Sequence, residues 1–342
     1  MRVLCAMSGG VDSSVTAALL AEQGHAVQGV TLRLWGGESD QGCCSVADVD
    51  DARRVADHLG LDHHVFNFGP DFDRQVVAPY VAAHAEGRTP NPCVECNRHL
   101  KFDRLLDRAR ALGFDAIATG HHARVVERPD GTRRVARGAD GPKDQSYVLY
   151  MLDQAALAQV LLPVGTMTKA EVRDRAAALG LRTAAKPDSQ DVCFIQAAAG
   201  RRGFLESRID LTPGRIVDAD GRKVGEVDAV ELVTVGQRRG LGLRSQQEPS
   251  FVTSVDVPTA TVTMGRKEDL LGQELVLTDL VWADRPVAGP VLAQCSAHGE
   301  VRSGVLDGSR LRWDQPQPRV APGQSVAFYD GAEVLGGGIA SV

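Results

Sequence analysis

The sequence predicts an α/β domain built on a parallel sheet, followed by a small β-rich middle domain and a C-terminal β-barrel. In the first 200 residues, short apolar runs alternate with segments of helical periodicity, as expected when helices cover both faces of a parallel sheet. From about Arg201 the helical periodicity fades, and short strand-like pieces separated by Gly, Pro and Asp take its place. A chain of 342 residues is long enough for two or three domains. We expect domains at residues 1–200, 201–256 and 257–342.

Composition and charge indicate a globular protein. The apolar fraction is 43%, the aromatic fraction is 5%, and no apolar run is long enough to span a bilayer. We therefore predict a cytoplasmic protein with no membrane partner. The net charge of −6 does not point to nucleic acid, but the pairs Arg201-Arg202 and Arg238-Arg239 leave a local basic patch open.

The first element is a strand, a glycine turn and a helix. An apolar run at 3–7 precedes Ser8-Gly9-Gly10-Val11-Asp12-Ser13-Ser14, and a helical pattern follows at 15–21. The glycines permit positive φ, the first N–H groups of the helix face an anion, and Asp12 is a candidate ligand for magnesium. No Lys follows the glycines, so this is not a P-loop, and G-x-G-x-x-G is absent. SGGVDSS resembles the loop of the ATP pyrophosphatases, which cleave ATP between its α and β phosphates and adenylate a substrate oxygen.

The rest of the first domain continues the alternation. The pattern predicts strands at 26–34, 61–68 and 114–120, and helices at 46–59, 71–85 and 97–112. A further apolar helix is expected after Tyr147, as far as Ala158, and Thr168 to Glu171 is a capping box for another that ends before Gly180. Ligands bind at the carboxyl ends of such strands, where SGGVDSS and the glycine at the end of 114–120 both lie.

The second half of the chain is predicted to be β-rich. Strands are expected at 214–217, 230–235, 251–255 and 261–264, and from Leu275 regularly spaced runs predict a small barrel. The loop at 236–242 is basic and glycine-rich, which suits a phosphate backbone, although a solvated turn would have the same composition.

Seven cysteines in a chain predicted to be cytoplasmic favour catalysis or metal binding over disulfides. Apolar neighbours predict that Cys5 and Cys295 are inert buried thiols, and for the loop residues Cys43 and Cys44 a structural role is also favoured. Cys93, Cys96 and Cys193 remain. Two prolines precede a helix expected from Asn97, so Cys96 would lie near its N-terminus, where the dipole stabilises a thiolate.

Seven motifs together resemble one family. They are SGGVDSS, TPNPCVECN, ATGHHAR, KDQSYVLY, SQDVCFI, GQRRGLGL and PGQSVAFYDG. Their order and spacing are similar to those of the bacterial tRNA-specific 2-thiouridylases of the MnmA type, over essentially the whole chain. The resemblance implies an ATP-dependent transferase that replaces the 2-oxygen of the wobble uridine with sulfur in tRNAs for Lys, Glu and Gln. Sulfur would come from a cysteine desulfurase or a sulfur-carrier protein.

The resemblance also implies roles for individual residues. Cys193 would carry a persulfide, and Cys96 would be the nucleophile that completes sulfur release through a transient disulfide. The ATP site would be formed by Ala6, Met7, Ser8, Gly9, Gly10, Val11, Asp12, Ser13, Leu32 and Gly120. Contacts with tRNA would come from Asn91, Pro92, Cys93, His121, Lys143, Asp144, Gln145 and Gln324. For His121 a structural role is an equal alternative.

One departure from the family pattern opens an alternative mechanism. Many members have Asp where this chain has Cys93, so the motif here is C-x-x-C, with Cys193 as a third thiol. Related thiolation enzymes use three cysteines to hold a 4Fe-4S cluster whose open iron binds the sulfur. We hypothesise such a cluster on Cys93, Cys96 and Cys193, while a harmless replacement of Asp remains the simpler interpretation. Zinc suits the sequence less, because no fourth Cys or His is obvious.

Two other functions fit part of the sequence. An ATP pyrophosphatase acting on a small metabolite would explain the loop, but neither the paired thiols nor the basic glycine loop. A tRNA-binding protein without enzymatic activity is the other, and tRNA-dependent release of AMP would exclude it.

Overall fold

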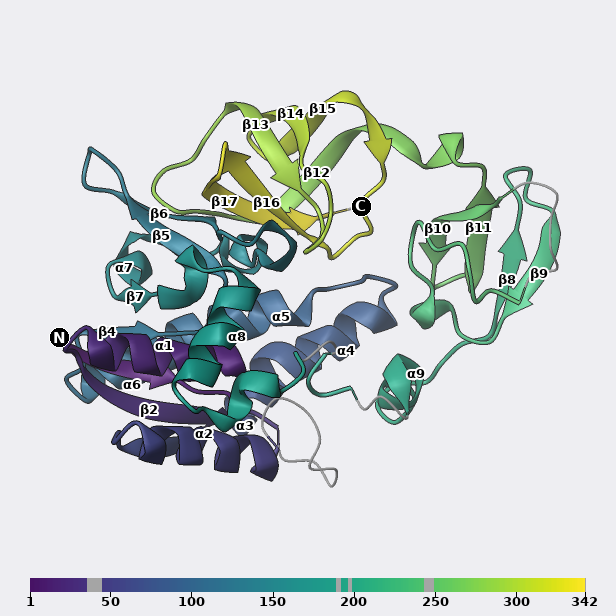
Figure 1. Ribbon diagram of the computed structural model, residues 1–342. Helices are drawn as coiled ribbons and strands as arrows, with labels where there is room; N and C mark the ends of the chain where they lie inside the picture. Colours follow the sequence, from purple (N-terminus) through teal and green to yellow (C-terminus); the bar gives the residue numbers. More distant parts are fainter. Residues whose placement is uncertain (36–44, 189–191, 196–198, 243–248, 342) are drawn as a thin grey trace.

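A five-stranded parallel sheet forms the first domain (Figure 1). The computed structural model describes residues 1–35, 45–188, 192–195, 199–242 and 249–341. The strand order is β3-β2-β1-β4-β7, and every neighbouring pair is parallel. The strands are β1 (Arg2–Ala6), β2 (Ala26–Arg33), β3 (His63–Asn67), β4 (Ala116–Ala118) and β7 (Val160–Leu161). The predicted parallel sheet is confirmed, and β7 is an edge strand that the sequence did not reveal.

Helices cover both faces of this sheet, as the alternation predicted. One face carries α1 (Val11–Glu22), α2 (Val46–His58) and α8 (Lys169–Ala178). The other carries two longer helices, each interrupted by a π-helical segment. These are α3 (Gly69–Phe72), η1 (Asp73–Val77) and α4 (Ala78–Ala85), then α5 (Pro92–Glu95), η2 (Cys96–Arg104) and α6 (Leu105–Ala111). Side chains alternate along β1, so that Val3 and Cys5 pack into one apolar cluster and Leu4 into the other.

Two predicted elements are wrong. In place of a helix to Ala158 the chain forms η4 (Ser146–Leu149) and α7 (Gln154–Leu157), because Asp153 between them caps α7 by accepting from Ala156 N. The strand predicted at 230–235 is instead the short 3-10 helix η7 (Val230–Leu232). The adjacent side chains of Val230 and Glu231 are both buried there, and the Glu231 carboxylate accepts from Thr212 N. In a strand, these two side chains would point to opposite faces of the sheet.

The remaining helical segments are short. They are η3 (Gly141–Lys143), η5 (Pro163–Thr166), η6 (Arg182–Ala185), α9 (Gly200–Glu206) and η8 (Glu268–Leu270). Within the described residues no helix is both long and apolar enough to cross a bilayer.

The middle region is a four-stranded sheet that lies to the right of the barrel in Figure 1. Its order is β10-β11-β8-β9, from β8 (Gly214–Val217), β9 (Lys223–Val227), β10 (Phe251–Asp256) and β11 (Thr261–Gly265). Helix α4 holds it in place, since His84 Nδ1 lies 3.2 Å from the Glu231 carbonyl oxygen and is buried there.

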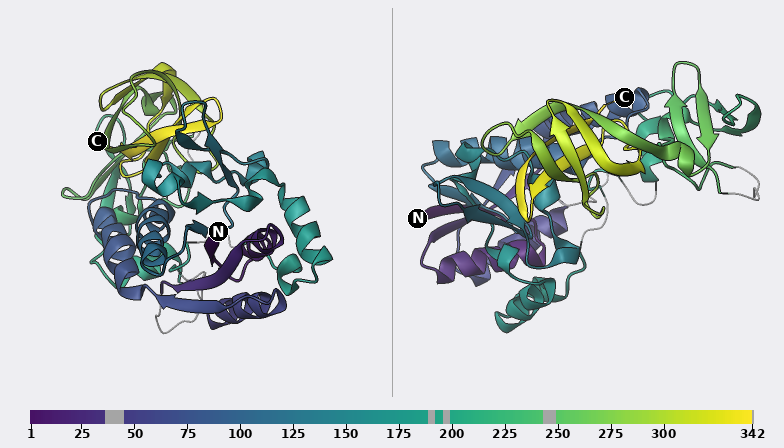
Figure 2. Two further views of the ribbon diagram at one scale, coloured as in Figure 1. Left: turned by 90° about the vertical axis from the view of Figure 1, so that its left-hand side faces the viewer. Right: turned by 90° about the horizontal axis from the view of Figure 1, so that it is seen from above.

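The C-terminal region is a closed barrel, as predicted. Its strands are β12 (Leu271–Trp282), β13 (Gly289–Gln294), β14 (Arg302–Asp307), β15 (Arg310–Pro318), β16 (Ser325–Asp330) and β17 (Glu333–Ala340). Strand β12 pairs with both β15 and β17, which closes the ring. A hairpin from the first domain, β5 (Ala123–Glu127) and β6 (Arg133–Arg137), joins the same sheet through β17, and Figure 2 shows it against the barrel.

Buried polar contacts fix the barrel against the first domain. Tyr147 donates to the Ser325 carbonyl at 2.8 Å, and the Ser146 hydroxyl lies 3.0 Å from that of Tyr329. The Arg137 guanidinium stacks 4.1 Å from the Tyr329 ring centre and donates to Gln294 at 2.8 Å. Because Ser146, Tyr147 and Tyr329 are buried and their hydroxyls paired, separating the domains would leave these hydroxyls unsatisfied.

Candidate active site

The loop after β1 has the predicted form of an anion cradle. Gly9 has φ +72° and Gly10 caps α1, while the hydroxyls of Ser13 and Ser14 donate to the Gly10 carbonyl at 3.1 and 2.8 Å. A side chain at Gly9 is excluded, because its Cβ would lie 2.3 Å from the Asp48 carbonyl oxygen. Helix α1 therefore begins with its amide groups directed into a tightly packed turn.

The end of β4 packs directly on this loop. A Cβ on Gly120 would lie 2.7 Å from Ser13 N and 3.0 Å from Asp12 Cβ. Strands β1 and β4 are neighbours. Within this sheet the chain continues from β1 to β2 and from β4 to β7, toward opposite edges. Such a switch point is where open parallel sheets bind ligands. The structure thus brings Ser8–Ser13 and Gly120, predicted from separate motifs, into contact.

Asp12 is paired within the protein. Lys169 Nζ donates to both carboxylate oxygens at 2.8 and 2.7 Å, and His122 Nε2 lies 3.0 Å from one of them. Burial favours the neutral acid, but the bonds to His122 and Lys169 outweigh it and hold the pKa of Asp12 below its ordinary value. Among the described residues no group of three His, Cys, Asp or Glu side chains could hold a metal ion. Asp12 is thus paired with Lys169 and His122, and its role as a magnesium ligand stays a prediction.

Asp188 lies at the centre of a second group of charges. Its carboxylate accepts from Lys143 Nζ and Arg173 Nη2, each at 2.8 Å, and forms an ion pair with Lys169 Nζ at 2.8 Å. Burial opposes ionisation, yet the bonds to the two lysines dominate and lower the pKa of Asp188 to about 2. Two residues earlier, Lys186 Nζ donates to the Gly9 carbonyl at 3.0 Å and to Asp48 and Asp51.

Sequence reasoning missed this charge network. Lys169 is the second residue of the capping box at α8, and the box itself is confirmed, so the pattern explained its neighbours without revealing the lysine's contact with Asp12. The sequence offered one signal for this network: Lys186 and Asp188 flank Pro187 just before the motif SQDVCFI.

The two predicted catalytic cysteines pack on one apolar cluster. Cys96 is buried in the cluster that contains Leu32, and Cys193, half-buried, packs against it, as does Ala6 at the end of β1. Two residues of the predicted ATP site and both thiols therefore share one face of the sheet.

The helix that contains Cys96 begins five residues before the predicted start at Asn97. The helix starts at Pro92, where a missing N–H costs nothing, and the Asn91 side chain caps it by accepting from Cys93 N at 3.1 Å. Cys93 thus occupies the first turn and Cys96 the second, where the effect of the dipole has fallen off.

The cluster hypothesis also meets a mismatch. Cys93 is exposed while Cys96 is buried, and the described part of the chain, which includes Cys93, Cys96 and Cys193, contains no group of side chains placed for a metal. These residues do not fit a 4Fe-4S cluster in this structure.

Cys5 is a buried thiol, as predicted, whereas Cys295 is only partly buried. Burial raises the pKa of Cys5 to about 12 and that of Cys295 to about 11, so both stay protonated near neutrality. Cys43 and Cys44 lie outside the described residues.

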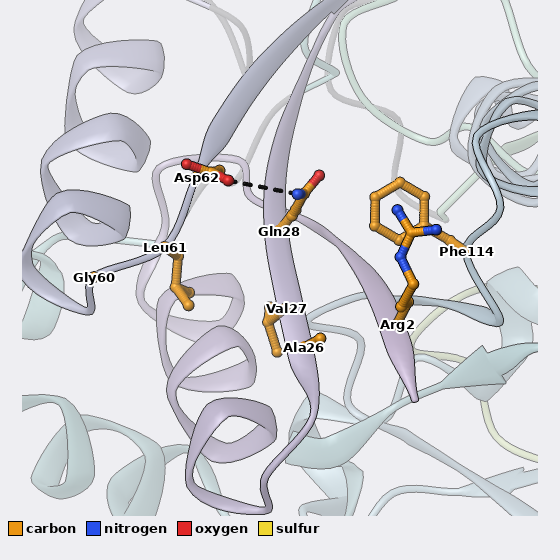
Figure 3. A pocket seen from close by; sticks show the side chains of 8 residues that line it. All are labelled: Arg2, Ala26, Val27, Gln28, Gly60, Leu61, Asp62 and Phe114. Atoms are coloured by element: carbon orange, nitrogen blue, oxygen red, sulfur yellow. Dashed lines mark hydrogen bonds between the residues drawn. The ribbon is translucent and has the colours of Figure 1, made fainter.

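Two surface hollows lie away from the loop. One, of about 180 Å³, is lined by Arg2, Gln28 and Phe114 among others and lies at the amino ends of β1 and β2 (Figure 3). The other, about 470 Å³, lies along the edge strand β3 beside Arg104 and Arg108. Because parallel sheets bind ligands at the carboxyl ends of their strands, the first is not the candidate active site.

Comparisons with known proteins identify the family. The tRNA methyl transferase HUP domain model matches residues 1–197, the tRNA methyl transferase PRC-barrel domain 202–266 and the aminomethyltransferase beta-barrel domain 293–340. The tRNA-specific 2-thiouridylase MnmA of Roseiflexus sp. (strain RS-1) is 44% identical, with 98% of both chains covered. That of Chloroflexus aggregans is 46% identical, covering 98% of this chain and 97% of the relative. This chain belongs to the tRNA-specific 2-thiouridylase family.

More distant likenesses to solved structures also exist. A 4-thiouridine synthetase in complex with RNA and ATP matches at TM-score 0.38 and 18% identity, covering 56% of this chain and 44% of the other. The U34-tRNA thiolase NcsA of Methanococcus maripaludis, with its [4Fe-4S] cluster, matches at 0.37 and 18%, covering 56% and 61%.

Several residues predicted to bind tRNA make contacts within the protein. Asp144 accepts from Arg137 at 2.7 Å, the Gln145 side chain accepts from His122 N at 2.9 Å, and Gln324 donates to the Thr89 carbonyl. His121 is buried against Thr119, with Nδ1 2.7 Å from its hydroxyl, and burial holds its pKa well below the ordinary value. For this set the contacts with tRNA stay predictions.

Proposed function

We propose that this protein catalyses ATP-dependent 2-thiolation of the wobble uridine of tRNA. The proposal is supported by two observations: the anion-binding loop lies at a sheet switch point, and Cys96 and Cys193 share one apolar cluster with Leu32 and with Ala6, which precedes that loop. The full-length likeness to relatives named tRNA-specific 2-thiouridylases supports it. Residues 1–200 would be the catalytic domain, followed by the tRNA-contacting middle domain and the barrel. Because β11 (Thr261–Gly265) pairs within the middle sheet, the middle domain extends to Gly265 and not only to the predicted residue 256.

The reaction needs ATP because a uracil carbonyl oxygen is a poor leaving group. The 2-oxygen attacks the α phosphate and pyrophosphate leaves, with the loop at Ser8–Ser13 holding the departing phosphates. A persulfide on Cys193 then attacks the ring carbon, and the C–O bond breaks as AMP departs. Magnesium would enter with ATP, and no step is assigned to Asp12 as its ligand.

Release of the sulfur uses the second cysteine. The Cys96 thiolate attacks the Cys193 sulfur that is bonded to the transferred sulfur, so that this S–S bond breaks and the sulfur stays on the ring. A Cys96–Cys193 disulfide forms, and an external thiol reduces it before a sulfur-carrier protein or a cysteine desulfurase reloads Cys193. The proposal places the enzyme in the cytoplasm, with tRNAs for Lys, Glu and Gln as substrates.

Mass spectrometry of tRNA nucleosides tests this function. The full chain is incubated with ATP, magnesium, a persulfide source and unmodified tRNA, and formation of 2-thiouridine and AMP is followed. Cys96→Ser and Cys193→Ser should abolish 2-thiouridine while retaining ATP binding. Cys295→Ser, at a half-buried cysteine just after β13 of the barrel, should retain both.

Two results would refute the proposal. AMP formation that does not require tRNA would favour a ligase for a small metabolite. Full thiolation by both serine variants would remove the cysteines from the mechanism.

A further inference from the structure

We propose that Asp188 is an internal counter-anion whose carboxylate occupies a phosphate-binding subsite made by Lys143, Lys169 and Arg173. A phosphate oxyanion entering this subsite must displace it. The inference rests on the proposed function in one respect, which is that the phosphate belongs to ATP. It adds a competitor for that phosphate within the chain itself.

The geometry places three cations on one carboxylate. Lys143 follows the β5–β6 hairpin, while Lys169 and Arg173 lie one turn apart on α8, and each approaches an Asp188 oxygen to 2.8 Å. The Lys169 side chain is only 12% exposed and that of Asp188 22%, so this pair is partly shielded from solvent, while Lys143 and Arg173 are more exposed. Two lysines and an arginine around a set of acceptor oxygens is the arrangement that proteins use for phosphate.

The subsite adjoins the glycine loop. Lys169 Nζ lies between two carboxylates, at 2.7 and 2.8 Å from the oxygens of Asp12 and 2.8 Å from Asp188. Asp12 is in the first turn of α1, directly after Gly9 and Gly10. A pyrophosphate on the loop amides would therefore reach Lys169. Pyrophosphate carries more negative charge than the Asp188 carboxylate that it would replace. Lys143 is also a residue that we expect to contact tRNA, so nucleic-acid phosphate is the other source of the same chemistry.

Competition by a tethered anion has two consequences. It lowers the apparent affinity for phosphate, because the cations must first give up Asp188. It also makes phosphate binding cost the contacts of Asp188 with Lys143, Lys169 and Arg173, while Lys186 keeps its hydrogen bond to the Gly9 carbonyl.

Titration calorimetry with inorganic pyrophosphate on the full chain, without tRNA, tests the inference. Asp188→Asn keeps the side chain's shape and removes the competing charge, so the Kd for pyrophosphate should fall about tenfold. Asp71→Asn is the matched control, because Asp71 pairs with Arg74 and Arg104 but with no cation of the subsite, and it should leave the Kd unchanged. A merely structural Asp188 would give the opposite result, since its loss would loosen the site. Unchanged or weaker binding by a variant that melts like the parent chain would overturn the proposal.

Variants of the cations keep the proposal testable if Asp188→Asn folds poorly. Lys169→Met and Arg173→Met, made singly, should weaken pyrophosphate binding, and the gain from Asp188→Asn should vanish when Lys169→Met is present. Unaltered affinity in both single variants would contradict the subsite.

A filter-binding assay with tRNA distinguishes the two sources of phosphate. If Asp188→Asn tightens tRNA binding but not pyrophosphate binding, the phosphate with which Asp188 competes belongs to nucleic acid, and the proposal fails. If the variant binds pyrophosphate more tightly but the parent chain thiolates no tRNA, the inference stands and the proposed function fails.

Discussion

At the scale of single residues, close packing at the loop determines which substitutions the site tolerates. Gly120 follows β4 with no space for a side chain, because the backbone of Asp12 and Ser13 occupies the position of a Cβ. This contact joins two motifs that lie more than a hundred residues apart. The sequence predicted both at the carboxyl ends of strands, but not their direct contact. A glycine after a strand is a common feature, so its function here follows from the fold.

Gly120→Ala tests this contact. The added methyl group must push the end of β4 away from the loop, which should lower the free energy of unfolding by about 1–3 kcal/mol and weaken ATP binding. Gly141→Ala is the control, since a Cβ there meets nothing within 4 Å, and its effect should stay within about 0.5 kcal/mol. Urea denaturation gives the stability and calorimetry gives the affinity for ATP. Equal stability and affinity in the two variants would show that β4 can shift freely.

At the scale of elements, aromatic packing holds the segment that carries Cys193. The Phe194 ring is buried among four others, with centroids 5.0 Å from Phe204, 5.4 Å from Tyr80, 5.7 Å from Phe72 and 6.3 Å from Trp35. These rings come from α9, α4, α3 and the end of β2. Each such pair contributes about 0.5–1.5 kcal/mol beyond the area it buries, so Phe194 is a firm anchor next to the cysteine.

Phe194→Ala should therefore separate the two halves of the reaction. Formation of AMP in the presence of tRNA should remain, because the loop is untouched, whereas 2-thiouridine should fall about tenfold as Cys193 loses its position. Phe66→Ala, on the edge strand β3, removes a ring that pairs with Phe68 and should change neither. A parallel loss of AMP and 2-thiouridine in Phe194→Ala would indicate general unfolding in place of positioning.

Elements with a strong periodic signal could be predicted from the sequence, and elements defined by distant partners could not. The strand and helix around SGGVDSS, the parallel sheet and the barrel all follow from local patterns. The helix expected after Tyr147 fails because Tyr147 and Tyr150 are buried aromatics whose partners include the barrel, a contact that no local rule contains. The ion pairs of Asp188 involve side chains up to 45 residues away, so the sequence shows each charge but not their meeting.

At the scale of the whole molecule, the boundary between the first domain and the barrel is not a simple cut in the chain. The β5–β6 hairpin precedes residue 200 yet extends the barrel sheet, with Ala136 in register with Glu333 of β17. Arg128 and Arg134 of this region form ion pairs with the same Glu333. The first domain and the barrel therefore share one continuous interface.

A fragment ending at residue 265 tests whether the first domain depends on this interface. Without the barrel, the edge of β6 loses its pairing with β17, and the buried hydroxyl of Tyr147 loses its acceptor at Ser325. An open strand edge beside exposed aromatics favours self-association, so the fragment should aggregate, bind a hydrophobic dye and melt well below the full chain. Size-exclusion chromatography and calorimetric melting measure both properties. A monomeric fragment that melts like the full chain and binds pyrophosphate with unaltered affinity would show that the first domain is independent, and that the interface serves only to place the barrel.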